Sequence, residues 1–310
     1  MTRLRTSLGD YLNMRRGLGF KLHYVGIALL DFVGFMERKR AIHITTKLAL
    51  DWAKESKSAL PSEWAKRLSW VRGFARYQSA VDPRTEIPPK GLLPYRPQRA
   101  RPYIYTDQEI KRLLATARSL PPKGGLRSWK YYCLLGLLSV TGLRIGEALN
   151  LKLADIDLHN NVLRIENAKF GKSRLVPIHP STQKVLVKYL QRRKRFLEGS
   201  TSPYLFTSGT GNRLDKADVH RTFYVLSRKI GLRGPTASRG PRLHDFRHRF
   251  AVQTLLNWYR RGLEIESRLP ILSTYLGHVH VSDTYWYLTA FPELMGQAVK
   301  RLEKHWEGAR

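Results

Sequence analysis

The sequence predicts a mostly helical protein in two parts: a small N-terminal helical bundle and a larger C-terminal domain that is mainly helical with a small antiparallel sheet. Apolar residues recur every three or four positions through residues 7–80, a proline-rich stretch follows, and two short strand-like segments lie among further helices beyond it. A chain of 310 residues is also longer than a typical single domain. We therefore expect domains at 1–80 and 103–310, joined by a basic linker at 81–102.

The N-terminal part divides into four amphipathic segments. Turns separate the helices expected at residues 8–16, 24–38, 45–56 and 63–77. In the last helix basic and aromatic side chains are interleaved, as in Arg67, Trp70 and Arg72. Such a helix could lay one face on a core and another on phosphate groups. An ordinary amphipathic helix explains the same pattern about as well.

The linker and the start of the second part have clear local signals. Residues 81–102 contain six prolines and little periodicity, which is typical of a linker. Thr106 and Glu109 then have the spacing of a capping box, in which each side chain accepts a hydrogen bond from the other residue's backbone N–H. The C-terminal domain should therefore begin near Tyr103.

In the C-terminal part the apolar pattern alternates between helical and extended. A buried helix is expected at 128–140 and a short one at 146–151, followed by strands at 162–166 and 173–178 around a turn. The remaining expected helices are 181–197, 216–229, 244–258, 269–276 and 292–306.

Composition limits the class of partner. Lys and Arg total 55 against 24 Asp and Glu, a formal net charge of +31, which favours a polyanion such as nucleic acid. A generally basic protein or one that binds membrane surfaces would carry a similar charge. Cys133 is the only cysteine, which excludes a disulfide framework and a thiolate zinc site. The sequence shows no signal-peptide pattern after Met1 and no apolar run long enough to span a bilayer, so we expect a cytoplasmic protein with no membrane partner.

The first of four clusters that carry chemistry is Thr141-Gly142-Leu143-Arg144-Ile145-Gly146-Glu147. Its first glycine allows a tight turn that puts Arg144 at the start of a helix, with Glu147 three residues on. Glu147 could then hold the Arg144 guanidinium. Alone, this pattern is more typical of a surface arginine paired with a glutamate.

The second cluster is a hairpin, residues 169–178, with Lys169 and Lys172 in its turn and an apolar return strand. A lysine at a hairpin tip can reach into a groove. Basic turns are common on basic proteins, however, so this cluster alone indicates little.

The third cluster is His244-Asp245-Phe246-Arg247-His248. His244 and Arg247 share a helix face and can converge on one anion. His244 and His248 could instead bind a metal, but Asp245 stands where the His-Glu-x-x-His motif requires glutamate.

The fourth cluster is Leu276-Gly277-His278, with Tyr287 nine residues beyond the histidine. Taken singly, the tyrosine would more often be a core residue. Together and in this order, however, the four clusters supply what phosphoryl transfer without a metal needs. Two guanidiniums can clamp the oxygens of a phosphate, imidazoles and an ammonium can move protons, and a phenol can attack phosphorus.

Through these motifs the sequence resembles the tyrosine recombinase, or phage integrase, family. The resemblance is strong from about Thr106 onward and looser in the N-terminal part. It implies a SAM-like core-binding bundle followed by a catalytic domain with the fold of DNA breaking-rejoining enzymes. The match of Thr-Gly-Leu-Arg-x-x-Glu implies Arg144 as the first catalytic arginine and Glu147 as its supporting carboxylate.

The other motifs imply the remaining site residues. Similarity to the family's Lys-x-x-Lys-x-Arg-x-Val-Pro segment implies Lys169, rather than Lys172, as the catalytic lysine. His-x-x-Arg implies His244 and Arg247, and Leu-Gly-His implies His278. The family's nucleophile lies nine residues beyond that histidine, which implies Tyr287 rather than Tyr285. The segment 279–286 departs from the family in being less polar than usual, and the run Asp-Thr-Tyr-Trp-Tyr-Leu at 283–288 looks like that of recombinases of transposons and related mobile elements.

The mechanism implied by the resemblance needs no metal, no organic cofactor and no small-molecule ligand. Tyr287 attacks double-stranded DNA to give a 3′-phosphotyrosine and a free 5′-hydroxyl. Arg144 and Arg247 bind the phosphate, Lys169 protonates the departing 5′-oxygen, His244 moves a proton and His278 donates a hydrogen bond to the phosphate. Strand exchange then passes through a Holliday junction in a homotetramer or with related recombinase subunits, on the bacterial nucleoid.

Several alternatives stay open. A catalytically silent DNA-binding accessory subunit would keep the fold, although all six catalytic positions are filled here. Type IB topoisomerases and telomere resolvases share related phosphotyrosine chemistry, and a metal-dependent nuclease would use the histidines and lose activity in EDTA. The amphipathic tail at 292–306 could dock on a neighbouring subunit or pack on its own domain.

Overall fold

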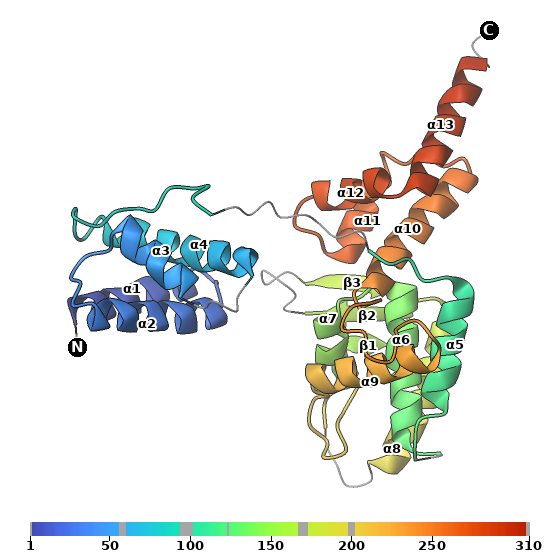
Figure 1. Cartoon of the computed structure of the whole chain (residues 1–310). Coiled ribbons are helices and arrows are strands. Elements are labelled where there is room, and N and C mark those ends of the chain that lie inside the picture. Colours follow the sequence, from blue (N-terminus) through green and yellow to red (C-terminus); the bar gives the residue numbers. More distant parts are fainter. Residues whose placement is uncertain are drawn as a thin grey trace. The chain divides into compact units, whose positions relative to one another are not determined.

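The computed structural model describes residues 2–55, 60–93, 102–122, 124–166, 173–197 and 202–307. The chain folds into two compact units, Met1–Ala100 and Arg101–Arg310 (Figure 1). Both are built mainly of helices, and the second also contains a small antiparallel sheet, so the predicted fold class is confirmed. No helix in the part of the chain that the structure describes is long and apolar enough to cross a bilayer.

The N-terminal unit is a bundle of four helices. They are α1 (Arg3–Gly17), α2 (His23–Arg38), α3 (Thr46–Lys54) and α4 (Pro61–Gln78), close to the four expected segments. Helix α1 begins at Arg3 rather than at residue 8 because Leu4 also faces the core. Fully buried side chains from all four helices form that core, namely Leu8, Leu29, Phe32, Trp52 and Phe74.

The segment expected to be a linker packs on this bundle over residues 81–93. The Glu86 backbone N–H donates to the carbonyl of Ile44 at 2.8 Å. Arg72 of α4 donates to the carbonyls of Pro88 and Pro89 at 2.6 and 2.8 Å. Residues 94–101 lie outside the described residues. The predicted domain boundaries at residues 80 and 103 stay predictions. In the structure, residues 81–93 lie on the surface of the N-terminal bundle.

The C-terminal unit contains the remaining described helices. They are α5 (Asp107–Arg118), α6 (Leu126–Thr141), α7 (Ile145–Asn150), α8 (Pro180–Phe196), α9 (Lys216–Lys229), α10 (Asp245–Arg260), α11 (Leu269–Leu276), α12 (Ser282–Ala290) and α13 (Pro292–Glu307). The predicted capping box of α5 is confirmed, because Glu109 N–H donates to Thr106 Oγ1 and Thr106 N–H donates to Glu109 Oε2. Apolar spacing did not predict helix α12, because the run of Tyr285, Trp286 and Tyr287 shows no single apolar face.

The sheet has three strands in the order β1-β2-β3, all antiparallel. These are β1 (Ile156–Asp157), β2 (Val162–Ile165) and β3 (Arg174–Pro177). Leu163 lies opposite Val176, and both side chains are fully buried against the core. The turn between β2 and β3, including Lys169 and Lys172, lies outside the described residues.

Two apolar clusters build the C-terminal unit. One gathers α5, α6, α8, α9 and the sheet, and the other gathers α10 to α13. Helix α6 packs on α5, α8 and α10, so its C-terminal end lies where the two clusters meet. The predicted site residues that the structure describes come from the turn after α6, from α7, from the start of α10, from the turn after α11 and from α12 (Figure 1).

Candidate active site

A tight turn after α6 presents the first arginine. Gly142 has φ +61°, and a Cβ there would lie 2.8 Å from the ring of Phe250, so both the backbone and the space require glycine. The turn makes Arg144 the N-cap of α7. Glu147 then accepts from the Arg144 backbone N–H at 3.0 Å and from its Nη1 at 2.8 Å. The predicted contact between the two side chains is confirmed.

Arg247 lies deeper. It is 2% exposed on α10 and donates from Nη1 to the carbonyl of Gly142 at 3.0 Å. Burial, and to a lesser extent the nearby positive charge of Arg144, lower the pKa of Arg247 to about 10. Arg247 is therefore still protonated at neutral pH. The side chain is therefore a buried, permanently charged group that joins α10 to the turn after α6.

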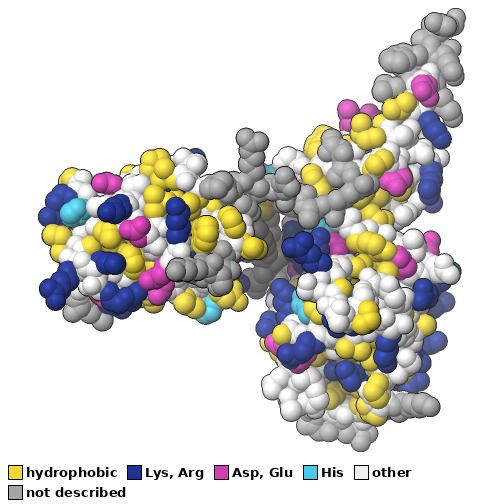
Figure 2. Space-filling model, in the orientation of Figure 1, with side chains coloured by type: hydrophobic (Ala, Val, Ile, Leu, Met, Phe, Trp, Pro, Cys, Tyr) yellow, Lys and Arg dark blue, Asp and Glu magenta, His cyan; other side chains and the backbone are white. Residues whose placement is uncertain are grey.

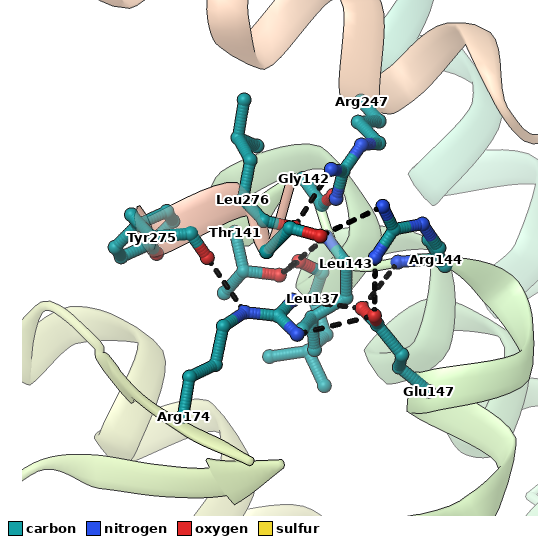
Figure 3. Close-up of polar contacts among 11 residues, drawn as sticks. Leu137, Thr141, Gly142, Leu143, Arg144, Glu147, Arg174, Arg247, Tyr275 and Leu276 are labelled. Carbon is teal, nitrogen blue, oxygen red and sulfur yellow. Dashed lines mark hydrogen bonds and ion pairs between the residues drawn. The ribbon is translucent and has the colours of Figure 1, made fainter. Parts of the chain in front are cut away.

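The C-terminal end of α11 collects three guanidiniums (Figure 3). The last carbonyls of a helix lack partners within the helix and carry the negative end of its dipole, so they attract cations. Here three consecutive carbonyls each accept from a different arginine, at 2.7, 2.7 and 3.0 Å. In order, Tyr275, Leu276 and Gly277 accept from Arg174, Arg247 and Arg144.

Glu147 is the acidic partner in this cluster. Its side chain is only 6% exposed and accepts from both Arg144 and Arg174. Burial alone would raise the pKa of Glu147, but the hydrogen bonds and charges of Arg174 and Arg144 outweigh it and lower the pKa to about 2. Three guanidiniums against one carboxylate leave the cluster with two uncompensated positive charges.

His244 sits beside this cluster just before α10. The surrounding protein, then the positive charge of Arg247, lowers the pKa of His244 to about 4. The residue is nevertheless exposed to solvent, and the neighbouring guanidiniums disfavour its charged form. A neutral imidazole open to solvent can accept a proton.

His278 follows the left-handed Gly277, which ends α11 at φ +69°. Its backbone N–H donates to the Ser273 carbonyl at 3.0 Å, and its Nδ1 lies 2.7 Å from Oγ1 of Thr284 on α12. The turn that presents His278 therefore also supplies the Gly277 carbonyl that holds Arg144.

Tyr287 lies on α12 with its ring nearly parallel to that of His278, at a centroid distance of 6.4 Å. It is 1% exposed, whereas Tyr285 is 48% exposed on another side of the helix. The Tyr287 hydroxyl lies 3.1 Å from Nδ1 of His248, a residue that is itself buried. The phenol is therefore next to the predicted site but covered, so it has to become accessible before it can attack a phosphate.

The structure brings together Arg144, Glu147, Arg247 and the Gly277-His278 turn, with Tyr287 packed beside His278. Lys169 lies outside the described residues. The rings of His244 and His248 are edge to face at 4.8 Å, and the described residues contain no group of three His, Cys, Asp or Glu side chains arranged to hold a metal ion.

Two participants were missed by the sequence reasoning. The sequence motifs imply no role for Arg174, the arginine of the hairpin segment, and only a possible metal site for His248. Both residues stand within motifs visible in the sequence, Arg174 in the Lys-Ser-Arg run of residues 172–174 and His248 directly after Arg247. Their partners, Glu147 and Tyr287, are far away along the chain and could be found only in the fold.

Comparison with known proteins identifies the family. Residues 104–293 match the model of the phage integrase family. The chain belongs to the phage integrase family. It is 59% identical to y4rB of Sinorhizobium fredii, whose name assigns it to the integrases and recombinases, over 99% of both chains. It is also 30% identical to the tyrosine recombinase XerD of Caulobacter vibrioides, over 77% of this chain and 74% of XerD.

Solved structures show the same fold. The chain is similar to the site-specific recombinase XerH bound to its difH substrate, with a TM-score of 0.65 and 19% identity over 90% of this chain and 78% of XerH. It is also similar to the integrase of transposon Tn1549 in complex with a circular intermediate DNA, with a TM-score of 0.66 and 17% identity over 96% and 99% of the two chains. This family member is therefore a tyrosine-type site-specific recombinase.

Proposed function

We propose that this recombinase cleaves and rejoins double-stranded DNA through a 3′-phosphotyrosine on Tyr287, and that it moves or integrates a mobile element. The observation that carries the chemistry is the cluster at the end of α11. Its two uncompensated positive charges lie beside a histidine and a phenol, which suits a phosphate whose negative charge grows in the transition state.

Each predicted residue then has a role in the reaction. Arg144 and Arg247 bind the non-bridging oxygens of the scissile phosphate, and His278 donates a hydrogen bond to them. His244 accepts the proton that the Tyr287 hydroxyl loses, and Lys169 protonates the 5′-oxygen as the bond from phosphorus to that oxygen breaks. The new bond joins phosphorus to the Tyr287 oxygen, so the bond energy is kept for rejoining.

Glu147 and the α11 carbonyls support the clamp rather than contact DNA. Among the described residues, the Arg144 side chain uses Nη1 on Glu147 and Nη2 on Gly277. A guanidinium has five N–H groups, so donors remain for a phosphate. Its side chain is also 27% exposed, which leaves the phosphate a path to it.

Two features support double-stranded DNA as the partner. Lys and Arg side chains are scattered over the visible faces of both units (Figure 2), in a chain with a net charge of +31. The similar XerH and Tn1549 integrase structures also hold DNA. We infer that the exchange passes through a Holliday junction within a tetramer, on the nucleoid in the bacterial cytoplasm. The similarity to y4rB and to a transposon integrase supports the mobile-element role.

The decisive experiment is covalent capture. A nicked suicide duplex made from the sequences that flank the gene should yield a protein–DNA adduct with the wild-type chain, in EDTA as well as in buffer with Mg²⁺. Tyr287→Phe should form no adduct and should bind the duplex as tightly as wild type. Tyr285→Phe, two residues earlier and exposed, is the matched control and should retain the adduct.

Three results would count against the proposal. An adduct of undiminished yield with Tyr287→Phe would refute the nucleophile. Activity lost in EDTA and restored by a divalent ion would favour a metal-dependent nuclease. An adduct that relaxes supercoils but never exchanges strands between two duplexes would favour a topoisomerase.

A further inference from the structure

Arg174, at the start of β3, is the third guanidinium of the cluster and has no part in the proposed chemistry. Its side chain is 8% exposed. All three of its nitrogens donate to protein groups: Nε to the Tyr275 carbonyl at 2.7 Å, Nη1 to Glu147 Oε1 at 3.1 Å, and Nη2 to Glu147 Oε2 at 2.8 Å. Unlike Arg247, which donates to neutral carbonyls, Arg174 pairs with both oxygens of a carboxylate, so its charge is already matched by protein and is not free for a phosphate.

The contacts of Arg174 join three elements that each carry or adjoin a proposed catalytic group. Strand β3 begins five residues after Lys169 in the sequence. Glu147 lies on α7, whose N-cap is Arg144. The Tyr275 carbonyl belongs to the end of α11, three residues before His278. One side chain therefore fixes the hairpin, the first arginine and the histidine turn relative to one another.

The fit of Arg174 against α11 is close. A Cβ on Gly277 would lie 2.8 Å from Nη1 and 2.9 Å from Cζ of Arg174. Two features therefore favour glycine at position 277: its backbone is left-handed, and the Arg174 guanidinium lies where a side chain would be. Such packing leaves little freedom for the carbonyl of Gly277, which holds Arg144.

Electrostatics gives Arg174 a second effect. Oε1 of Glu147 accepts from both Arg144 Nη1 and Arg174 Nη1, and Oε2 accepts from Arg174 Nη2 and the Arg144 backbone. Without Arg174, the carboxylate could turn both oxygens to the Arg144 guanidinium in a bidentate, electrically neutral pair. With it, the Glu147 charge is shared, and Arg144 keeps net positive charge for the phosphate.

We propose that Arg174 is a positioning residue for strand cleavage, which holds Glu147 and the end of α11 so that Arg144 is aimed at the scissile phosphate. The inference rests on the proposed function. It predicts that loss of Arg174 slows the chemical step while DNA binding, which depends on many surface cations, stays nearly unchanged.

The test measures single-turnover formation of the covalent adduct on a nicked suicide duplex, with protein in excess at saturating concentration. Arg174→Ala should cleave about 100-fold more slowly than wild type, as small misplacements of catalytic groups do. Its affinity for the intact duplex should stay within about threefold of wild type, since Arg174 is buried and binding depends on many surface cations. Added guanidinium ion at a non-denaturing concentration should restore part of the rate.

The matched control is Arg193→Ala. Arg193 is also a buried arginine of the C-terminal unit, 7% exposed, and donates to the carbonyls of Ser202 and Tyr204 at 2.7 and 2.8 Å, away from the cluster. It tests whether loss of any buried guanidinium slows cleavage. Arg193→Ala should cleave at close to the wild-type rate once both variants are compared below their melting temperatures, and guanidinium should not speed it.

A double-mutant cycle with Glu147→Gln tests the route of the effect. If Arg174 acts through Glu147, the double variant should cleave no more slowly than the slower single variant, because residues in one network are not additive. Additive losses would assign Arg174 a role separate from Glu147 and overturn the proposal.

The remaining outcomes are distinct. A folded Arg174→Ala variant that cleaves within about threefold of wild type, or an equal loss in Arg193→Ala, would overturn the role of Arg174. If the alanine variant does not fold, Arg174→Lys is measured in its place, because lysine keeps the charge but cannot bridge Glu147 and Tyr275. A wild-type cleavage rate in Arg174→Lys would overturn the proposal. No adduct with the wild-type chain would instead defeat the proposed function.

Discussion

Replacing Glu147 by glutamine tests whether the carboxylate stabilises the arginine cluster. The side chain is 6% exposed and its pKa is lowered from 4.5 to about 2. That difference corresponds to about 3 kcal/mol of stability at neutral pH. Glutamine keeps the shape but removes the charge, and Arg174 then remains buried without an ionic partner. We expect Glu147→Gln to lose about 3 kcal/mol, a fall in Tm of roughly 6–12 °C for a unit of this size.

The assay is calorimetric unfolding of the full chain, following the transition of the C-terminal unit. A lowered carboxyl pKa gives stability that is complete above the unfolded value of 4.5 and is lost as pH falls through about 2. The difference between wild type and Glu147→Gln should therefore be equal at pH 7 and pH 5. The control is Asp218→Asn in the same unit, whose exposed pair with Arg221 should contribute less than about 1 kcal/mol.

A loss below about 1 kcal/mol for Glu147→Gln would refute the reasoning, because a buried carboxylate shared by two arginines cannot then be a net stabilising group. A difference that shrinks between pH 7 and pH 5 would also refute it, since Glu147 should stay ionised throughout that range.

Three further predictions follow from the site. Arg144→Ala should slow covalent adduct formation by about 100-fold or more, as loss of a transition-state donor does, and an unchanged single-turnover rate would contradict its place in the clamp. The ring of His244 should stay neutral in the folded protein until the pH falls well below 6. Because the unfolded chain binds this proton more readily, the free energy of unfolding should decrease as the pH drops from 6.5 toward 4. An NMR titration with a midpoint near 6.5 would show that the guanidiniums do not act on this ring. His248→Ala should lose about 1–3 kcal/mol because it removes a hydrogen-bond partner of the buried Tyr287 hydroxyl, and His248→Asn, whose amide can accept or donate there, should lose less in urea unfolding.

Local sequence rules determined most of the elements. The apolar spacing predicted the helices of the N-terminal bundle, and the capping residues Thr106 and Glu109 fixed the start of α5. These succeed because helix propensity, capping and amphipathicity act over a few neighbouring residues. The same rules missed β1, which has only two residues, and α12, whose aromatic residues are distributed around the helix.

The order and spelling of the motifs also determined the candidate residues and the family. The turn at Gly142 shows why local sequence was enough to predict the position of Arg144. This turn requires a left-handed φ and a close contact with Phe250, and the turn alone makes Arg144 an N-cap. The pairing of Arg144 with Glu147 is likewise local, three residues apart on one helix.

Only the tertiary structure decided how these residues work together. No rule of spacing brings Arg174, Arg247 and Arg144 to three consecutive carbonyls at the end of α11, because those contacts join elements separated by up to 133 residues of chain. Nor does the sequence show that Tyr287 is covered and lies against His248. Charge and motif specify which groups are present, whereas packing of α6, α10, α11 and β3 determines which helix dipole they meet and which of their donors remain for DNA.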